Sequence, residues 1–184
     1  MKKFFIIVLL CLAFILSSCA KDTHNESGTD TTAAPVTIGS FTQEDLVFAI
    51  DGANFPLDTD IAPLIEILGD GYTLSTAPSC VYDGEDKTYD YGNIIIYTYP
   101  NGEKDIIWEI DILGSEYPTN KGIKVGDSLE DINAAYGDAG FEVGHTYIYN
   151  ISEDEDDIES PQLCFEFNED KISRIIFYSP SNLT

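Results

Sequence analysis

Two runs of alternating side chains, joined by a turn sequence, constrain the fold of this chain more than any other feature. In residues 93–99, the tyrosines at every second position alternate with Ile96 and Thr98. In residues 106–112, which follow Asn101-Gly102, apolar side chains alternate with a second set that includes Glu109 and Asp111. Alternation is typical of strands with two different faces, and Asn-Gly is a frequent turn in tight hairpins. We therefore predict an antiparallel hairpin that carries Trp108 on one face and Glu109 and Asp111 on the other.

A similar order of elements occurs twice along the chain. Residues 60–70 and 128–138 begin 68 residues apart, and each has apolar residues at i, i+3 and i+7 followed by Gly-Asp. This spacing predicts a short amphipathic helix that ends at a glycine. Further strands are expected at residues 46–50, around 80–82, and at 147–151, 163–167 and 172–178. The expected fold class is α+β: two tandem helix-plus-antiparallel-meander units form a two-layer sandwich with the helices on one face of the sheet.

The segment that opens the second helix resembles the signature of a known fold. Residues 122–132, Gly-Ile-Lys-Val-Gly-Asp-Ser-Leu-Glu-Asp-Ile, are followed by Ala135-Tyr136-Gly137. They look like the segment that opens each unit of the β-lactamase-inhibitor-protein-like fold, which also occurs in envelope lipoproteins of the SmpA/OmlA type. Residues 78–102 resemble lipoproteins of gut Firmicutes. The resemblance implies a tandem fold and protein binding through an open sheet face, but not β-lactamase inhibition, because no inhibitory loop can be matched.

The first residues have the pattern of an export signal. Lys2 and Lys3 precede the apolar run 4–16, which is too short to span a bilayer core of ~30 Å as a permanent helix. Leu16-Ser17-Ser18-Cys19 resembles the lipobox of bacterial lipoproteins, which implies diacylglycerol and palmitate at Cys19; the alternative is a plain signal peptide. We expect a signal peptide at 1–18, a lipidated tether at 19–40, and one globular domain at 41–184 with repeats at about 45–115 and 120–180. The protein would be an extracellular one, anchored by lipid to the outside of the cell membrane.

The charge balance excludes one class of partner. Without residues 1–18 the chain has 7 basic and 33 acidic side chains, a formal net charge of 7 − 33 = −26. Such a chain repels phosphate, so we expect no nucleic-acid partner and no membrane contact beyond the lipid anchor. A partner with a basic surface would be attracted to it.

Few residues offer catalytic chemistry. His145 is the one histidine outside the expected tether, and no serine or cysteine stands near it in the sequence to suggest a triad. Residues 83–86 and 154–157 are acidic loops that calcium could use, yet neither fits the spacing of an EF-hand. We expect no metal site and no cofactor apart from the covalent diacylglycerol.

Tyrosines on or beside the predicted strands form the candidate site. Tyrosine combines a large contact area with a polar tip, which suits a recognition surface. The candidate residues are Tyr89, Tyr91, Tyr97 and Tyr99 with Glu109 and Asp111. The expected function is a binding or interaction module that recognises an unknown protein partner through this Tyr-rich, acidic face, without catalysis. The alternatives are an envelope hydrolase that uses paired carboxylates and a purely structural envelope protein.

Two cysteines remain in the predicted globular domain. Cys80 and Cys164 could form a disulfide in an exported protein, or both could stay free. The sequence leaves these two alternatives open.

Overall fold

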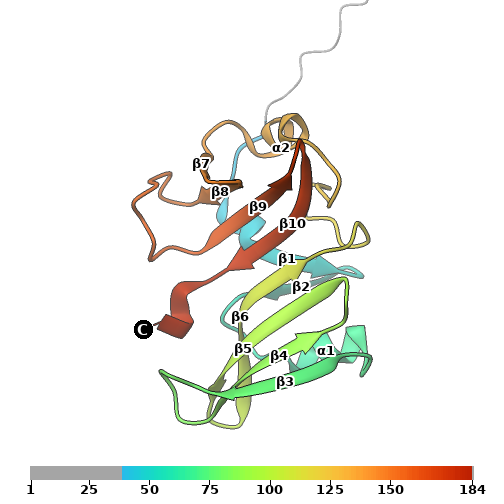
Figure 1. The fold of residues 1–184 in the computed structure, drawn as a ribbon, viewed down its shortest axis with the longest axis vertical. Helices are drawn as coiled ribbons and strands as arrows, with labels where there is room; N and C mark the ends of the chain where they lie inside the picture. Colours follow the sequence, from blue (N-terminus) through green and yellow to red (C-terminus); the bar gives the residue numbers. More distant parts are fainter. Residues whose placement is uncertain (1–38, 184) are drawn as a thin grey trace, which may run out of the picture. The chain divides into compact units, whose positions relative to one another are not determined.

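The computed structural model describes residues 39–183, which form one antiparallel sheet with smaller elements packed against it (Figure 1). The helical elements are η1 (Gln43–Leu46), α1 (Ala62–Leu68), α2 (Leu129–Tyr136) and η2 (Pro180–Leu183). The strands are β1 (Val47–Ile50), β2 (Ala53–Pro56), β3 (Thr73–Pro78), β4 (Glu85–Asp90), β5 (Ile94–Asn101), β6 (Lys104–Ile112), β7 (Phe141–Val143), β8 (Thr146–Asn150), β9 (Gln162–Asn168) and β10 (Lys171–Tyr178).

The predicted α+β class and its two tandem helix-plus-meander units are wrong, because the described chain is mostly β. Eight strands form a single sheet in the order β3-β4-β5-β6-β10-β9-β8-β7, and β1 pairs with β2 as a separate hairpin. The antiparallel pairing of β6 with β10, from Ile112–Ile175 to Glu109–Tyr178, joins the strands that follow α1 to those that follow α2. The sheet therefore does not divide into two units.

The helices are also too short to form a layer by themselves. α1 has 7 residues and α2 has 8, and each ends at a glycine with positive φ, Gly69 at 80° and Gly137 at 84°. A side chain other than glycine is strained in that region, which stops each helix where the sequence predicts. The β1–β2 hairpin fills much of the remaining area, with Phe48 and Phe55 buried in the same core as the sheet.

The core lies between one face of the sheet and these smaller elements. Phe48 of β1 contacts Phe177 of β10 edge to face, with ring centroids 6.1 Å apart. The sheet contributes every second residue of its central strands, and the opposite layer contributes residues from β1, β2, α1 and α2. The fully buried core side chains include Phe48, Leu64, Ile94, Ile96, Ile110, Ile112, Ile132, Tyr136, Phe165 and Phe177.

The predicted hairpin is confirmed, but one of its side chains lies on the unexpected face. Strands β5 and β6 are joined at Gly102, whose φ is 65°. Tyr97 pairs with Glu109 and Thr98 pairs with Ile107, so Trp108 is an extra residue in a β-bulge. A bulge re-aims a side chain. Trp108 therefore lies on the same face as Glu109, and the prediction that placed it on the opposite face is wrong.

The cysteines of the described domain are both free, Cys80 exposed and Cys164 buried. None of the helices within residues 39–183 is both long and apolar enough to cross a bilayer. The expected signal peptide, the lipid attachment residue Cys19 and most of the tether lie outside the described residues.

Candidate functional site

The candidate site lies on the face of the sheet that points away from the core, which we call the open face. Residues that pair across neighbouring strands share a face, and Tyr97, Glu109 and Tyr178 pair in one continuous row from β5 through β6 to β10. We define the open-face cluster by its polar and aromatic members, which come from β5, β6, β9 and β10. They are Tyr97, Trp108, Glu109, Asp111, Glu166, Arg174 and Tyr178.

Three aromatic rings form a row across the middle of this face. The ring of Trp108 lies 5.7 Å from that of Tyr97 and 5.9 Å from that of Tyr178, measured between centroids. All three side chains are partly exposed. A row of rigid rings with polar tips is typical of surfaces that bind proteins.

Next to the aromatic row, one arginine joins two carboxylates. The guanidinium of Arg174 donates from Nη1 to Asp111 Oδ2 at 3.2 Å and from Nη2 to Glu166 Oε1 at 2.8 Å. Asp111 is only 1% exposed, whereas Arg174 and Glu166 reach solvent at 34% and 36%. Asp111 Oδ1 and Arg174 Nε are buried and have no hydrogen-bond partner among the residues that the structure describes.

Burial and crowding of like charges change the acidity of Glu109. The pKa of Glu109 is raised from 4.5 to about 8, first by loss of solvent and then by the negative charge of the neighbouring Asp111, which outweighs the opposing effect of Arg174. Burial also raises the pKa of Asp111, although the Arg174 guanidinium opposes this change. Two carboxyl groups this close do not ionise independently. At neutral pH the pair therefore retains one proton, which we place on Glu109.

The structure brings together three of the six predicted site residues. Tyr97, Glu109 and Asp111 are neighbours on the open face, and the carboxylates of Asp111 and Glu109 both raise the pKa of Tyr97, after the larger effect of burial. Glu109 and Asp111 alternate with buried Ile110, so the spacing of two residues puts both carboxyls on one face.

The other three predicted residues lie elsewhere. Tyr89 pairs with Ile96 of the core face, and its hydroxyl donates to Asp105 Oδ2 at 3.0 Å. The Tyr91 hydroxyl donates to the carbonyl of Gly69 at 2.8 Å. Their rings contact Tyr72 at the opposite side of the sheet, with centroids 5.0 and 5.5 Å apart.

Tyr99 has the strand position of the open face but little exposure. Its ring stacks on that of Tyr82 at 4.5 Å, and only 8% of Tyr99 is accessible. The hydroxyl of Tyr82 donates to the carbonyl of Ser181 in η2, so the C-terminal turn closes this end of the sheet. We therefore exclude Tyr99 from the open-face cluster.

Sequence reasoning missed Trp108, Glu166, Arg174 and Tyr178 as members of the site. Trp108 is the single tryptophan of the chain, and that rarity alone could have marked it as a candidate. The face of the sheet on which it lies, however, depends on the bulge. Arg174 follows a second register shift, between Ile172 and Arg174 of β10. Neither register shift can be predicted from the alternation of side chains, because that argument assumes a regular strand.

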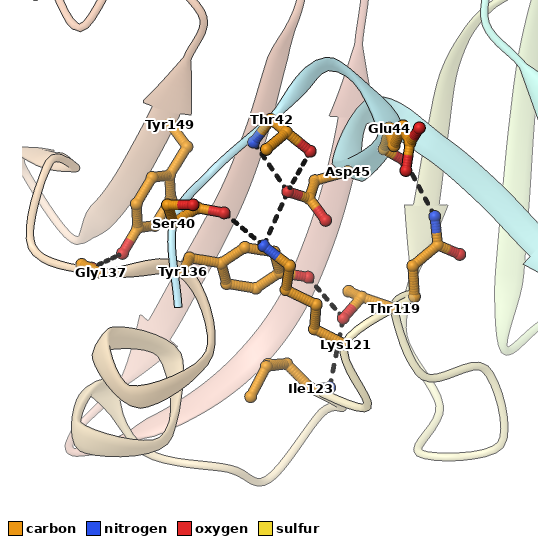
Figure 2. A network of polar contacts seen from close by, with 11 residues as sticks. Ser40, Thr42, Glu44, Asp45, Thr119, Lys121, Ile123, Tyr136, Gly137 and Tyr149 are labelled. Carbon is orange, nitrogen blue, oxygen red and sulfur yellow. Dashed lines mark hydrogen bonds and ion pairs between the residues drawn. The ribbon is translucent and has the colours of Figure 1, made fainter. Parts of the chain in front are cut away.

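A second polar network fastens the start of the described chain to the domain (Figure 2). The ammonium group of Lys121 donates to Asp45 Oδ2 at 2.8 Å and to the carbonyl of Ser40 at 2.6 Å, and it lies 4.7 Å from the ring centroid of Tyr136. Asp45 Oδ2 also accepts from the backbone N–H of Thr42 at 2.8 Å. Because Asp45 is 4% exposed and its Oδ2 accepts from both Lys121 and Thr42, we interpret this network as structural.

The same view shows hydrogen bonds from two tyrosine hydroxyls next to this network (Figure 2). Tyr136 donates to Thr119 Oγ1 at 2.6 Å, and Tyr149 donates to the carbonyl of Gly137 at 2.6 Å. Burial raises the pKa of both hydroxyls well above the usual value. Both hydroxyls stay protonated and act as donors, and the bond from Tyr149 to Gly137 holds the end of α2 against β8.

The residues considered for catalysis and calcium show no comparable arrangement. His145 is exposed at the rim of a hollow of about 390 Å³. In the acidic loop after β8, the carboxylate of Asp157 accepts from the hydroxyl of Ser160 at 2.6 Å and so closes the loop on itself. Within residues 39–183, no group of three or more histidine, cysteine, aspartate or glutamate side chains is placed to hold a metal ion.

Comparison with known proteins does not assign this chain to a family. No family model matches it, and no curated protein matches it. One solved structure, of an extracellular protein containing a SCP domain from Bacillus anthracis str. Ames, shares 11% identity over 69% of this chain and 45% of that one, with a TM-score of 0.44. The chain thus spans less than half the length of that protein, and a similarity of this size carries no argument here.

Proposed function

We propose that this protein is a lipid-anchored extracellular module that binds a protein partner through the open-face cluster. The observation that carries the proposal is the row of Tyr97, Trp108 and Tyr178 beside Glu109, Asp111 and Glu166 on one sheet face. The rings offer contact area, and the carboxylates select for a basic partner. The same proposal includes the export signal and the lipid anchor at Cys19. It also includes the resemblance of residues 78–102 to lipoproteins.

A hydrolase that uses paired carboxylates is the second candidate, because the pKa of Glu109 is raised as a general acid requires. This candidate is weaker on geometry. Hydrolysis by two carboxyl groups needs both of them to reach the scissile bond or an attacking water. Asp111 is 1% exposed and bound to Arg174, so Glu109 is the accessible member of the Glu109–Asp111 pair.

The binding proposal can be tested by photo-crosslinking in cells that make the full chain. A photoreactive phenylalanine derivative replaces Thr88, which pairs with Tyr97 and is partly exposed on the open face. A matched control places it at Leu74, which is 47% exposed and pairs with Tyr89 on the other face. We expect a discrete protein adduct from position 88, lost in a Trp108→Ala background, and none from position 74. Equal adducts from both positions, or none from position 88, would refute the proposal.

A further inference from the structure

Four ionisable groups of the open-face cluster determine which ligand it can accept. With Glu109 protonated, Asp111 and Glu166 are charged against one arginine, which leaves a formal charge of 1 − 2 = −1. If Glu109 lost its proton without replacement, the cluster would carry −2 on a partly buried surface, which is costly. An incoming cation that takes the place of the proton restores −1.

We propose that Glu109 binds the guanidinium of one arginine side chain presented by the partner, and that it gives up its proton in exchange. The proposal rests on the proposed function and names the chemistry of the partner at that site. The O–H bond of Glu109 breaks, its proton passes to solvent, and two N–H···O contacts from the guanidinium take its place. No other reactant is needed.

The buried carboxylate of Asp111 supports a site for a hydrogen-bond donor here. Asp111 is almost completely buried, and its Oδ1 has no hydrogen-bond partner among the described residues, although Glu109 is its neighbour on the same strand face. The carboxyl of Glu109, when it is protonated, and the hydroxyl of Tyr97 are the neighbouring groups that can donate to the Asp111 carboxylate. When the partner's arginine displaces that proton, the positive charge of the guanidinium bound to Glu109 stabilises the neighbouring Asp111 carboxylate in its place.

The aromatic row explains why the cation should be a guanidinium rather than a metal ion or an amine. A planar guanidinium can stack on an aromatic ring while it makes two parallel hydrogen bonds to a carboxylate, which an ammonium cannot do. Trp108 follows Ile107 and precedes Glu109 on β6, and its ring lies on the face of Glu109. Metal ligation would require further side chains that the described residues do not supply.

The groups around Glu109 do not titrate in the same range. From β9 and β10, the Cys164 thiol has its pKa raised to about 12 and the Tyr178 hydroxyl has its pKa raised above 10, in both cases first by burial. The pKa of Tyr97 on β5 is raised in the same direction. The remaining charged neighbours are Asp90, Asp111, Glu166 and Arg174. A transition near pH 8 therefore belongs to the coupled carboxyl pair of Glu109 and Asp111.

The experiment uses the full-length protein in a non-ionic detergent and a capped tripeptide with a central arginine. Calorimetry at pH 6, 7, 8 and 9 gives the affinity, and repetition at pH 7 in two buffers of different ionisation heat gives the number of protons released. We expect the affinity to rise about tenfold between pH 6 and 7 and to level off above about pH 8, with close to one proton released at pH 7. Emission of the single tryptophan, Trp108, should change on binding and locate the peptide at this site.

Two variants and one peptide make the result decisive. Glu109→Gln mimics the protonated side chain, so it should fold but lose both the pH dependence and most of the affinity. Glu103→Gln, in the exposed turn of the same hairpin, should leave both unchanged. A lysine tripeptide should bind more weakly. Binding without proton release, an unchanged pH profile in Glu109→Gln, or no binding of the arginine peptide at pH 9 would overturn the inference, while crosslinking from position 88 would still support the proposed function.

Discussion

At the scale of single residues, the two polar networks of the domain differ in how completely they are satisfied. Asp45 is buried, but Lys121 and the N–H of Thr42 both donate to its carboxylate. Asp111 is buried to a similar degree, yet its Oδ1 has no hydrogen-bond partner within the described part of the chain. Buried polar groups are hydrogen-bonded as a rule, so this oxygen depends on the proton that we place on Glu109.

The Asp45–Lys121 ion pair should contribute strongly to stability. Lys121→Met removes the positive charge and leaves the buried carboxylate of Asp45 without its ionic partner. We expect the free energy of unfolding to fall by about 3 kcal/mol, as for other buried pairs broken on one side. Urea denaturation of the full chain measures this loss. Because the added Asp45→Asn change removes the uncompensated charge, the double variant should recover part of it; a double variant that is less stable than Lys121→Met would contradict our interpretation.

Glu109 should make the fold less stable as the pH rises. Its pKa is raised from 4.5 to about 8 in the folded protein, so between these values the unfolded chain loses a proton that the folded protein retains. Ionisation then favours the unfolded chain, and stability should decrease from about pH 4.5 to pH 8 and change little beyond. Glu109→Gln removes this effect. The variant should be more stable than the wild type by about 2 kcal/mol at pH 9, a value reduced for partial exposure, and equal to it at pH 4. Thermal unfolding at both pH values checks this; a constant difference between the two proteins would contradict it.

At the scale of elements, the second layer of the domain depends on a hairpin more than on helices. The sequence pattern predicts α1 and α2 correctly in position, but 7 and 8 residues bury little area. Strands β1 and β2 pair with each other and not with the main sheet, and their phenylalanines enter the core. The fold class was wrong because eight strands form one continuous sheet and the two helices are too short to make a layer of their own.

Two truncations compare these elements directly. Phe48→Ala in β1 should lower the free energy of unfolding by about 4 kcal/mol, because the side chain is 1% exposed and leaves a large cavity. Ser128→Ala removes the N-cap of α2, where Ser128 Oγ accepts from the N–H of Asp131, and should cost only about 1 kcal/mol. Denaturant titration of both variants provides the measurement. A larger loss for Ser128→Ala than for Phe48→Ala would mean that the helices dominate the second layer.

At the scale of the whole molecule, the proposed function requires that the domain be held at a membrane surface. Residue 39 is the first described one, and its N–H donates to the carbonyl of Ala134 in α2 at 3.0 Å. The chain therefore enters the domain at the network of Figure 2, on the side that carries α2. The open face lies on the side of the sheet opposite to α2.

The lipid anchor is tested by a single substitution. Cys19→Ala removes the thiol that diacylglycerol would modify, so the variant should stay an unlipidated precursor and no longer be labelled by a fatty-acid probe in cells. Cys80→Ala, which changes an exposed free thiol of the domain, is the matched control and should be labelled as the wild type is. Persistent labelling of Cys19→Ala would show that the segment 16–19 is not a lipobox.

The sequence by itself determined those features that depend on neighbouring residues. Asn101-Gly102 placed the β5–β6 turn, because glycine accepts the positive φ that the turn needs. Gly69 and Gly137 ended the two helices for the same reason. Alternation put Glu109 and Asp111 on one face and Ile110 on the other, since side chains in a strand alternate regardless of what packs against them.

Only the tertiary structure decided the features that depend on contacts between distant segments. Whether β6 continues into β10 as one sheet is a matter of long-range pairing, which no local pattern encodes. The bulge at Trp108 reversed the expected side of that residue, and parity between β4 and β5 moved Tyr89 to the core face. Arg174 reaches Asp111 across 63 positions of sequence. The open-face cluster exists because four strands meet, and a single strand's sequence carries no record of its neighbours.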